Sequence, residues 1–271
     1  MGWLKVEADK QIYFEHYPGQ EPTVVLCHGW GMAGQAWANT VARLMDAGRG
    51  VVVYDHRGCG RSDKDFADVS IEALGDDLAA LVEHLVLDRV VLNGWSLGGA
   101  VVVDAAAKLG QRLAGLVLTV GATPRYTQAE GFPHGGTAAD VAATVAALRA
   151  DRQNFLRTLY YDGAFGKDVG ETTKQWFWQI AMQASPGADA SLAALASVDQ
   201  RATLAALTAP VLVFVGEADG VVAPDIGRAA AALATKGRLV ELPGCGHVPF
   251  LEDPDTYHGE LQRFLQEVSH G

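Results

Sequence analysis

Short apolar runs rich in β-branched residues recur along the chain, and stretches with helical spacing separate most of them. After Ser70, apolar residues recur every three or four positions, as expected for a helix that this serine caps. Strands that alternate with helices predict an α/β fold with a mostly parallel sheet, covered by helices on both faces. A short pair of strands within residues 4–17 is expected to form an antiparallel edge. The predicted strands of the sheet are Thr23–Cys27, Gly50–Tyr54, Val90–Asn93, Leu113–Val120, Val211–Val215 and Leu239–Leu242.

The alternation breaks between about residues 123 and 207. This stretch predicts helices and no convincing strand, and Thr137 and Asp140 occupy capping-box positions for the first of them. The pattern therefore predicts a core of residues 1–122 and 208–271 with a helical cap of residues 123–207. The cap is rich in aromatic residues, some of which should line a ligand cavity, because pockets form where two units meet. The predicted cap helices are Ala138–Leu148, Asp151–Tyr161, Thr172–Ala184 and Ala190–Ser197.

Charge and composition exclude several classes of partner. The 271 residues include 32 Asp and Glu against 21 Lys and Arg, so the formal net charge is -11 and a nucleic-acid backbone would be repelled. No apolar run reaches the roughly 18 to 20 residues of a membrane span, and the first residues lack the features of a signal peptide. We therefore expect a cytoplasmic protein. The oligomeric state stays open.

Three cysteines are widely separated and lack the spacing of a metal site or a disulfide framework. Cys27, Cys59 and Cys245 are predicted to be small buried thiols.

The segment Gly94-Trp95-Ser96-Leu97-Gly98 follows a predicted strand and precedes a helix-forming stretch. Glycine on both sides of a serine permits a sharp turn that holds the side chain clear of the backbone. This G-x-S-x-G pattern predicts a nucleophile elbow that presents Ser96.

A serine hydroxyl is a weak nucleophile at neutral pH, so it needs a base and an orienting carboxylate. Asp219 and His247 each follow a predicted strand. Because ligand sites lie at the carboxyl ends of parallel strands, Ser96, Asp219 and His247 are expected at one edge of the sheet. Glu217 and Asp225 are alternative carboxylates.

His28 and His56 are alternative bases that also lie at strand ends, although His28 is expected to brace its own loop. The remaining histidines have no such placement: His16, His84, His134, His258 and His270.

Acyl attack creates an oxyanion that needs preorganised N–H donors. The amide of Leu97, at the start of a helix, and the amide of Trp30, between two glycines, are the predicted donors.

Five motifs in this order resemble the α/β-hydrolase family over nearly the whole chain. They are His28-Gly29-Trp30-Gly31, YDHRGCGRSD at residues 54–63, the serine pentapeptide, APVLVFVGEADGVV and GCGHVPFLEDP. The resemblance implies the α/β-hydrolase fold and a serine hydrolase that needs no metal and no organic cofactor. HGWG with GWSLGG is most similar to carboxylesterases that cleave pimeloyl-acyl carrier protein methyl ester, whereas DHRGCGRS resembles the non-haem haloperoxidase and perhydrolase branch.

We therefore expect a carboxylesterase that acts on a small-molecule ester. Trp30, Trp95, Trp176 and Trp178 are predicted to shape its substrate pocket. Arg149, Arg152 and Arg157 form a weak candidate patch for an acidic carrier protein. Lactone hydrolysis, C–C bond hydrolysis, perhydrolysis and acyl transfer could use the same three residues, and a ligand-binding protein without catalysis is the non-enzymatic alternative.

Overall fold

The computed structural model describes residues 1–269; His270 and Gly271 lie outside the described residues. The strands form one eight-stranded sheet in the order β1-β2-β4-β3-β5-β6-β7-β8. β1 and β2 pair antiparallel, β2 joins β4 antiparallel, and all later pairs are parallel, which confirms the predicted sheet and its antiparallel edge. The strands are β1 (Gly2–Lys5), β2 (Gln11–Tyr17), β3 (Gln20–Cys27), β4 (Arg49–Tyr54), β5 (Val90–Trp95), β6 (Leu113–Thr119), β7 (Val211–Gly216) and β8 (Gly237–Leu242).

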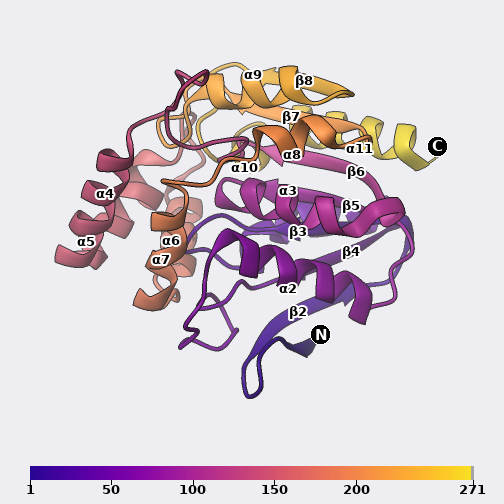
Figure 1. Ribbon diagram of the computed structural model, residues 1–271, viewed down its shortest axis with the longest axis horizontal. Helices are drawn as coiled ribbons and strands as arrows, with labels where there is room; N and C mark the ends of the chain where they lie inside the picture. The colour runs from indigo at the N-terminus through magenta and orange to yellow at the C-terminus, as the bar shows by residue number, and fades with distance from the viewer. Residues whose placement is uncertain (270–271) are drawn as a thin grey trace.

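The central strands are buried on both faces, which is why they read as continuous apolar runs and not as alternating ones. α2 (Ile71–His84), α3 (Leu97–Leu109) and α8 (Arg201–Ala206) lie on the near side of the sheet in Figure 1. Ser70 caps α2 as predicted, because its hydroxyl accepts a hydrogen bond from the amide of Ala73. The other helices of this part are α1 (Ala38–Asp46), α9 (Pro224–Leu233), α10 (Pro249–Glu252) and α11 (Pro254–Ser269).

The segment between β6 and β7 is helical, as predicted, apart from isolated bridges within residues 127–136. Figure 1 shows α4, α5, α6 and α7 gathered beside one edge of the sheet. Thr137 and Asp140 form the predicted capping box of α4. α8 also belongs to the segment between β6 and β7, but it packs against α3 and α9, which cover the sheet. The helical elements are α4 (Ala138–Ala150), α5 (Arg152–Arg157), the π-helical turn η3 (Thr158–Gly163), α6 (Glu171–Ala181), the short turn η4 (Pro186–Ala188) and α7 (Asp189–Ala194).

None of the helices in residues 1–269 is both long and apolar enough to cross a membrane. The three cysteines are free and buried, as predicted.

Candidate active site

Ser96 sits on a sharp turn between β5 and α3. Its φ of 56° and ψ of -123° lie in a region that side-chain-bearing residues rarely adopt, at a typical cost of about 1–3 kcal/mol. The flanking glycines make the turn possible. A Cβ at Gly98 would lie 2.6 Å from the carbonyl oxygens of Cys27 and His28, and one at Gly94 would collide with the first turn of α3. The sequence pattern is therefore explained by backbone crowding around the serine.

Asp219 and His247 form a buried pair in the loops that follow β7 and β8. His247 Nδ1 lies 2.8 Å from Asp219 Oδ2, and both side chains are almost fully buried. The second carboxylate oxygen accepts hydrogen bonds from the amides of Val221 and Val222, at 2.7 and 3.0 Å. Since Oδ1 is held by the backbone, Oδ2 has a fixed direction toward the imidazole.

The backbone of His247 is also fixed from two sides. Its amide donates to the carbonyl of Ala164 at 2.7 Å, and its carbonyl accepts from Trp95 Nε1 at 2.7 Å. Across the described chain, Ser96 Oγ makes no hydrogen bond, although Ser96 and His247 line one cavity. Catalytic hydrogen bonds are often long without substrate, so this geometry is compatible with proton transfer after substrate binds.

The alternative residues lie in other surroundings. Glu217 is exposed, and Asp225 pairs with Arg228 at 2.7 Å. His28 accepts a hydrogen bond from the amide of His56 and contacts the carbonyl of Gly29, so it braces these loops as expected. Burial lowers the pKa of His28 to about 4 and also holds the pKa of His56 well below its usual range. Both rings are therefore neutral at pH 7.

The predicted oxyanion donors lie at the same cavity. Leu97 is the first residue of α3, and Trp30 follows β3. Within residues 1–269, neither amide donates a hydrogen bond to another protein group. The carbonyl of Trp30 accepts a hydrogen bond from the Tyr160 hydroxyl, and its indole Nε1 donates to the carbonyl of Ala188 at 3.3 Å. The helical segment thus holds Trp30 while its amide stays available.

The inner cavity, which Ser96 and His247 line, has a volume of about 200 Å³. Its other walls are mostly apolar, as is typical of ligand sites. Phe155, Leu159, Tyr160, Leu192 and Leu195 line it from the helical segment, together with Trp30 and Leu97 from the sheet side.

The four predicted pocket tryptophans are not all at the cavity. Trp30 lines it. The structure, which describes residues 1–269, does not place Trp95, Trp176 or Trp178 in its walls. Trp95 is fully buried below the site, where it packs against His247 and Phe250. Trp176 and Trp178 are only partly buried and pack beside the core on α6.

Sequence reasoning assigned no role to Glu252, although it lies in the quoted GCGHVPFLEDP motif. Its buried carboxylate accepts four backbone hydrogen bonds of 2.7–2.9 Å from the amides of Gly166, Lys167, Gly246 and Val248. Two donors belong to the helical segment and two flank His247. Glu252 therefore ties this segment to the loop that carries His247.

The candidate basic patch on the helical segment is largely occupied. Arg152 binds Asp189 through two contacts of 2.7 and 2.9 Å, and Arg157 pairs with Asp162. Arg149 is exposed. Because the guanidinium groups of Arg152 and Arg157 are paired with carboxylates of the same chain, the three arginines do not form an open cationic surface.

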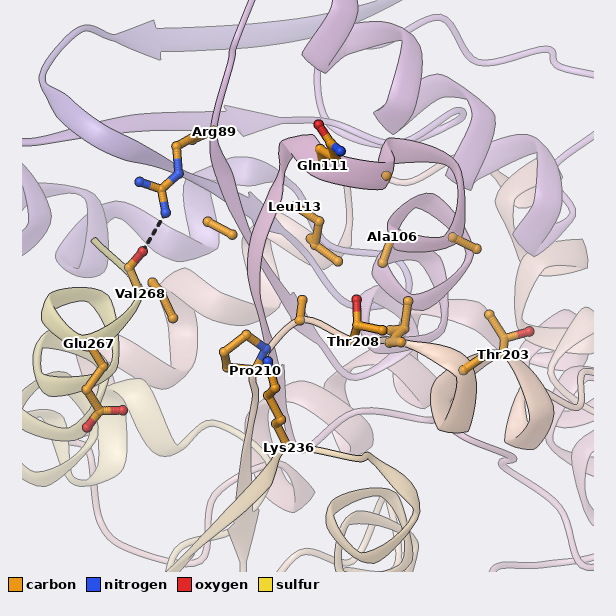
Figure 2. Close-up of a pocket in the computed structure, with 16 residues that line it drawn as sticks. Arg89, Ala106, Gln111, Leu113, Thr203, Thr208, Pro210, Lys236, Glu267 and Val268 are labelled. Carbon is orange, nitrogen blue, oxygen red and sulfur yellow. Dashed lines mark hydrogen bonds between the residues drawn. The ribbon is translucent and has the colours of Figure 1, made fainter. Parts of the chain in front are cut away.

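A larger groove of about 900 Å³ lies at the amino-terminal ends of the central strands, opposite the end that carries Ser96 (Figure 2). Leu113 opens β6 there, Pro210 precedes β7, and Arg89 donates to the carbonyl of Val268 at 2.8 Å. None of Ser96, Asp219 and His247 lines this groove. The inner cavity, although smaller, is the one that Ser96 and His247 line, so it is the candidate active site. Within residues 1–269, no cluster of three His, Cys, Asp or Glu side chains could hold a metal.

Comparisons with known proteins agree with this architecture. The α/β hydrolase fold family matches residues 22–254. A pimeloyl-[acyl-carrier protein] methyl ester esterase of Stenotrophomonas maltophilia is 31% identical, covering 93% of this chain and 95% of its own. A bifunctional esterase/perhydrolase of Acinetobacter calcoaceticus is 27% identical, covering 98% and 100%. An esterase structure from Exiguobacterium antarcticum superposes with a TM-score of 0.93 at 27% identity, covering 98% and 100%. The chain therefore belongs to the α/β hydrolase fold family and is an esterase-type hydrolase, as its motifs indicated.

Proposed function

We propose that the protein hydrolyses a small carboxylic ester through an acyl-enzyme on Ser96. The observation that carries this proposal is the buried 2.8 Å contact between His247 and Asp219, with the imidazole and the strained Ser96 at one apolar cavity. A neutral imidazole held by a carboxylate is suited to take a proton from serine and to return it.

In the first half of the reaction, His247 Nε2 takes the hydroxyl proton as Ser96 Oγ attacks the ester carbonyl. The carbonyl electrons move onto oxygen, where the amides of Trp30 and Leu97 stabilise the oxyanion. The intermediate collapses with cleavage of the carbon–oxygen bond to the alcohol. His247 gives its proton to the leaving alkoxide, and the acyl group stays on Ser96.

In the second half, water enters the cavity and His247 takes one of its protons. The hydroxide oxygen attacks the acyl carbon, the oxyanion forms again at the same amides, and Ser96 leaves with the proton from His247. Asp219 keeps the imidazole in the required tautomer and stabilises its charged form in both halves.

In this proposal the helical segment 123–207 acts as a cap that closes the cavity, with α8 packed on the core. Its aromatic and aliphatic lining supports an apolar acyl or alcohol group. A cytoplasmic location remains a prediction from the sequence.

The first test compares hydrolysis of p-nitrophenyl acetate, butyrate, octanoate and palmitate by the intact protein and by Ser96→Ala. We expect Ser96→Ala to lose essentially all turnover, because the attacking oxygen is gone. Ser197→Ala removes an exposed hydroxyl from the helical segment and should behave like the intact protein. Equal hydrolysis by Ser96→Ala and the intact protein would contradict the proposal.

Perhydrolysis is a second candidate, favoured by the likeness to the bifunctional esterase/perhydrolase. Hydrogen peroxide would replace water in the second half, so that its oxygen attacks the acyl carbon and a peracid leaves while Ser96 regains its proton. Peracid formation from acetate ester and peroxide, lost in Ser96→Ala, would establish this activity.

A further inference from the structure

A second cavity of about 340 Å³, here called the outer cavity, adjoins the inner one. Its remaining walls come from residues 135–141 before and at the start of α4, from Asp219, and from Ala223 and the first turn of α9. Two cavities that share five wall residues are neighbours, separated only by the side chains and backbone of that shared wall. The shared residues are Tyr126, Thr144, Leu192, Gly220 and Val221.

The partition between the cavities contains one side-chain bridge. The Tyr126 hydroxyl donates to the carbonyl of Val221 at 3.1 Å, and the amide of Val221 donates in turn to Asp219 Oδ1. The bridge therefore joins the loop after β6 to the loop that holds Asp219. Tyr126 is thus one of the five residues between the two spaces, and its truncation would remove the largest side chain of the shared wall.

Gly220 contributes no side chain to the shared wall. A Cβ at this exposed position would meet no atom within 4 Å, and the residue has no positive φ that would require glycine. The backbone turn therefore does not depend on glycine here.

The lining of the outer cavity indicates which chemical group it accepts. Val141, Ala223, Pro224 and Ile226 are apolar, and none of the lining side chains carries a positive charge. Two carboxylates are there and both already have partners. Asp140 Oδ2 accepts hydrogen bonds from the amide and hydroxyl of Thr137, and Asp219 is held by backbone amides and by His247. An anionic group would meet carboxylates and no cation, so an uncharged chain fits best.

The volumes of the two cavities also indicate that one ligand could occupy both. Ligand sites typically span about 300–1,000 Å³, and the inner cavity falls below this range. The outer cavity brings the combined space within it.

We propose that the outer cavity is a second substrate subsite, which receives the far end of an extended, uncharged aliphatic chain of the ester. Tyr126 and Gly220 then determine how long a chain is turned over. This inference rests on the proposed ester hydrolysis at Ser96, and it assigns the substrate class as esters with a medium-length chain on one side of the carbonyl.

The test fills the outer cavity without touching the inner one. Val141 lines only the outer cavity and is buried, so Val141→Phe should lower kcat/KM for p-nitrophenyl octanoate relative to acetate by at least about tenfold. Ala143→Phe adds the same ring to the exposed side of α4 and is the matched control. The octanoate-to-acetate ratio of this control should equal that of the intact protein.

A second variant acts in the opposite direction and keeps the test decisive if Val141→Phe folds poorly. Tyr126→Ala opens the partition and should raise the ratio for palmitate relative to octanoate by about tenfold. Thermal unfolding of each variant identifies loss of folding. The same variants are assayed on octyl acetate and ethyl acetate, so that a chain on the alcohol side is distinguished from one on the acyl side.

A ratio that changes in the predicted direction in either substrate series supports the subsite and identifies which side of the ester enters it. Ratios that stay unchanged or move in the opposite direction in both series, in folded variants that still hydrolyse acetate, overturn the subsite and leave the esterase proposal intact. Failure of the intact protein to hydrolyse any ester would instead contradict the proposed function itself.

Discussion

The two sides of the inner cavity are built in different ways. The floor consists of loops at the carboxyl ends of β5, β7 and β8, where backbone hydrogen bonds fix Ser96, Asp219 and His247. The roof consists of side chains from α5, η3 and α7, which pack against one another and against the core. In the proposed reaction, the groups that must be positioned closely for chemistry lie on the side fixed by backbone hydrogen bonds, and the apolar groups that contact substrate lie on the side built from side chains. The comparison suggests that floor substitutions change the rate of reaction, whereas roof substitutions change mainly which ester is accepted.

The largest effect is expected from the buried acid of the floor. Asp219→Asn should lower kcat/KM by roughly 10³- to 10⁴-fold, because an amide neither selects the tautomer of His247 nor stabilises the charged imidazole. Kinetics on p-nitrophenyl butyrate measure the change. Glu217→Gln, at the exposed neighbouring carboxylate, is the matched control and should keep full activity. Similar losses in both variants would refute the assignment of the acid.

Glu252 joins the His247 loop of the floor to residues 166 and 167 of the helical segment, so its substitution tests how much this connection stabilises the protein. Glu252→Gln places an amide group against four backbone donors, and the free energy of unfolding should fall by about 3 kcal/mol. Chemical denaturation measures the loss. Asp255→Asn, on an exposed carboxylate of α11, should leave stability close to that of the intact protein. A stable Glu252→Gln protein would show that these contacts contribute little.

Acid should destabilise the folded protein through a buried histidine of the core, outside both the floor and the roof. His258 is buried between α11 and α1, with Nε2 3.0 Å from Thr40 Oγ1, and burial lowers its pKa to about 4. The folded protein keeps the ring neutral, whereas the unfolded chain takes up a proton below its ordinary pKa of about 6.5. The stabilising contribution is therefore complete above about pH 6.5 and is lost as the pH falls toward 4.

We expect His258 to raise the free energy of unfolding by up to about 2 kcal/mol between pH 5 and pH 7. Denaturation of the intact protein and of His258→Gln at both pH values measures it. The variant should show a smaller difference between the two pH values. His28 and His56 will leave part of the dependence in place, since they are also buried and neutral. An identical pH dependence in both proteins would contradict the assignment.

The smallest effect is expected from the hydroxyl that joins the roof to Trp30. Tyr160→Phe removes the hydrogen bond to the Trp30 carbonyl and should lower kcat/KM by roughly three- to tenfold, the usual range for one neutral hydrogen bond. Tyr161→Phe removes the neighbouring, half-buried hydroxyl and is the control. If the control loses as much activity, the Tyr160 contact has no particular role in holding the oxyanion loop.

The sequence predicted the floor well, because its residues obey local rules. Gly94 and Gly98 are required by backbone crowding, and Asp219 and His247 follow apolar strands whose ends must meet at one edge of a parallel sheet. Such constraints are visible in short motifs. The same motifs predict that Leu97 and Trp30 lie beside Ser96, and both line the inner cavity.

The roof was predicted only in composition. The aromatic content of the helical segment was evident, but which rings face the cavity depends on packing between α5, η3 and α7. Phe155 and Tyr160 face it, whereas Trp176 and Trp178 pack elsewhere. Glu252 shows a further limit, since its donors come from residues about 86 positions away as well as from its own loop. Nothing in the local sequence indicates such a pairing.

Mass spectrometry of the protein quenched during turnover of p-nitrophenyl butyrate tests whether Ser96 is the nucleophile. We expect a butyryl adduct on the peptide that carries Ser96, formed as p-nitrophenol is released and absent from Ser96→Ala. Accumulation is favoured by Asp219→Asn if deacylation slows more than acylation. An adduct on another residue, or rapid turnover of Ser96→Ala, would contradict the assignment of Ser96 as the nucleophile.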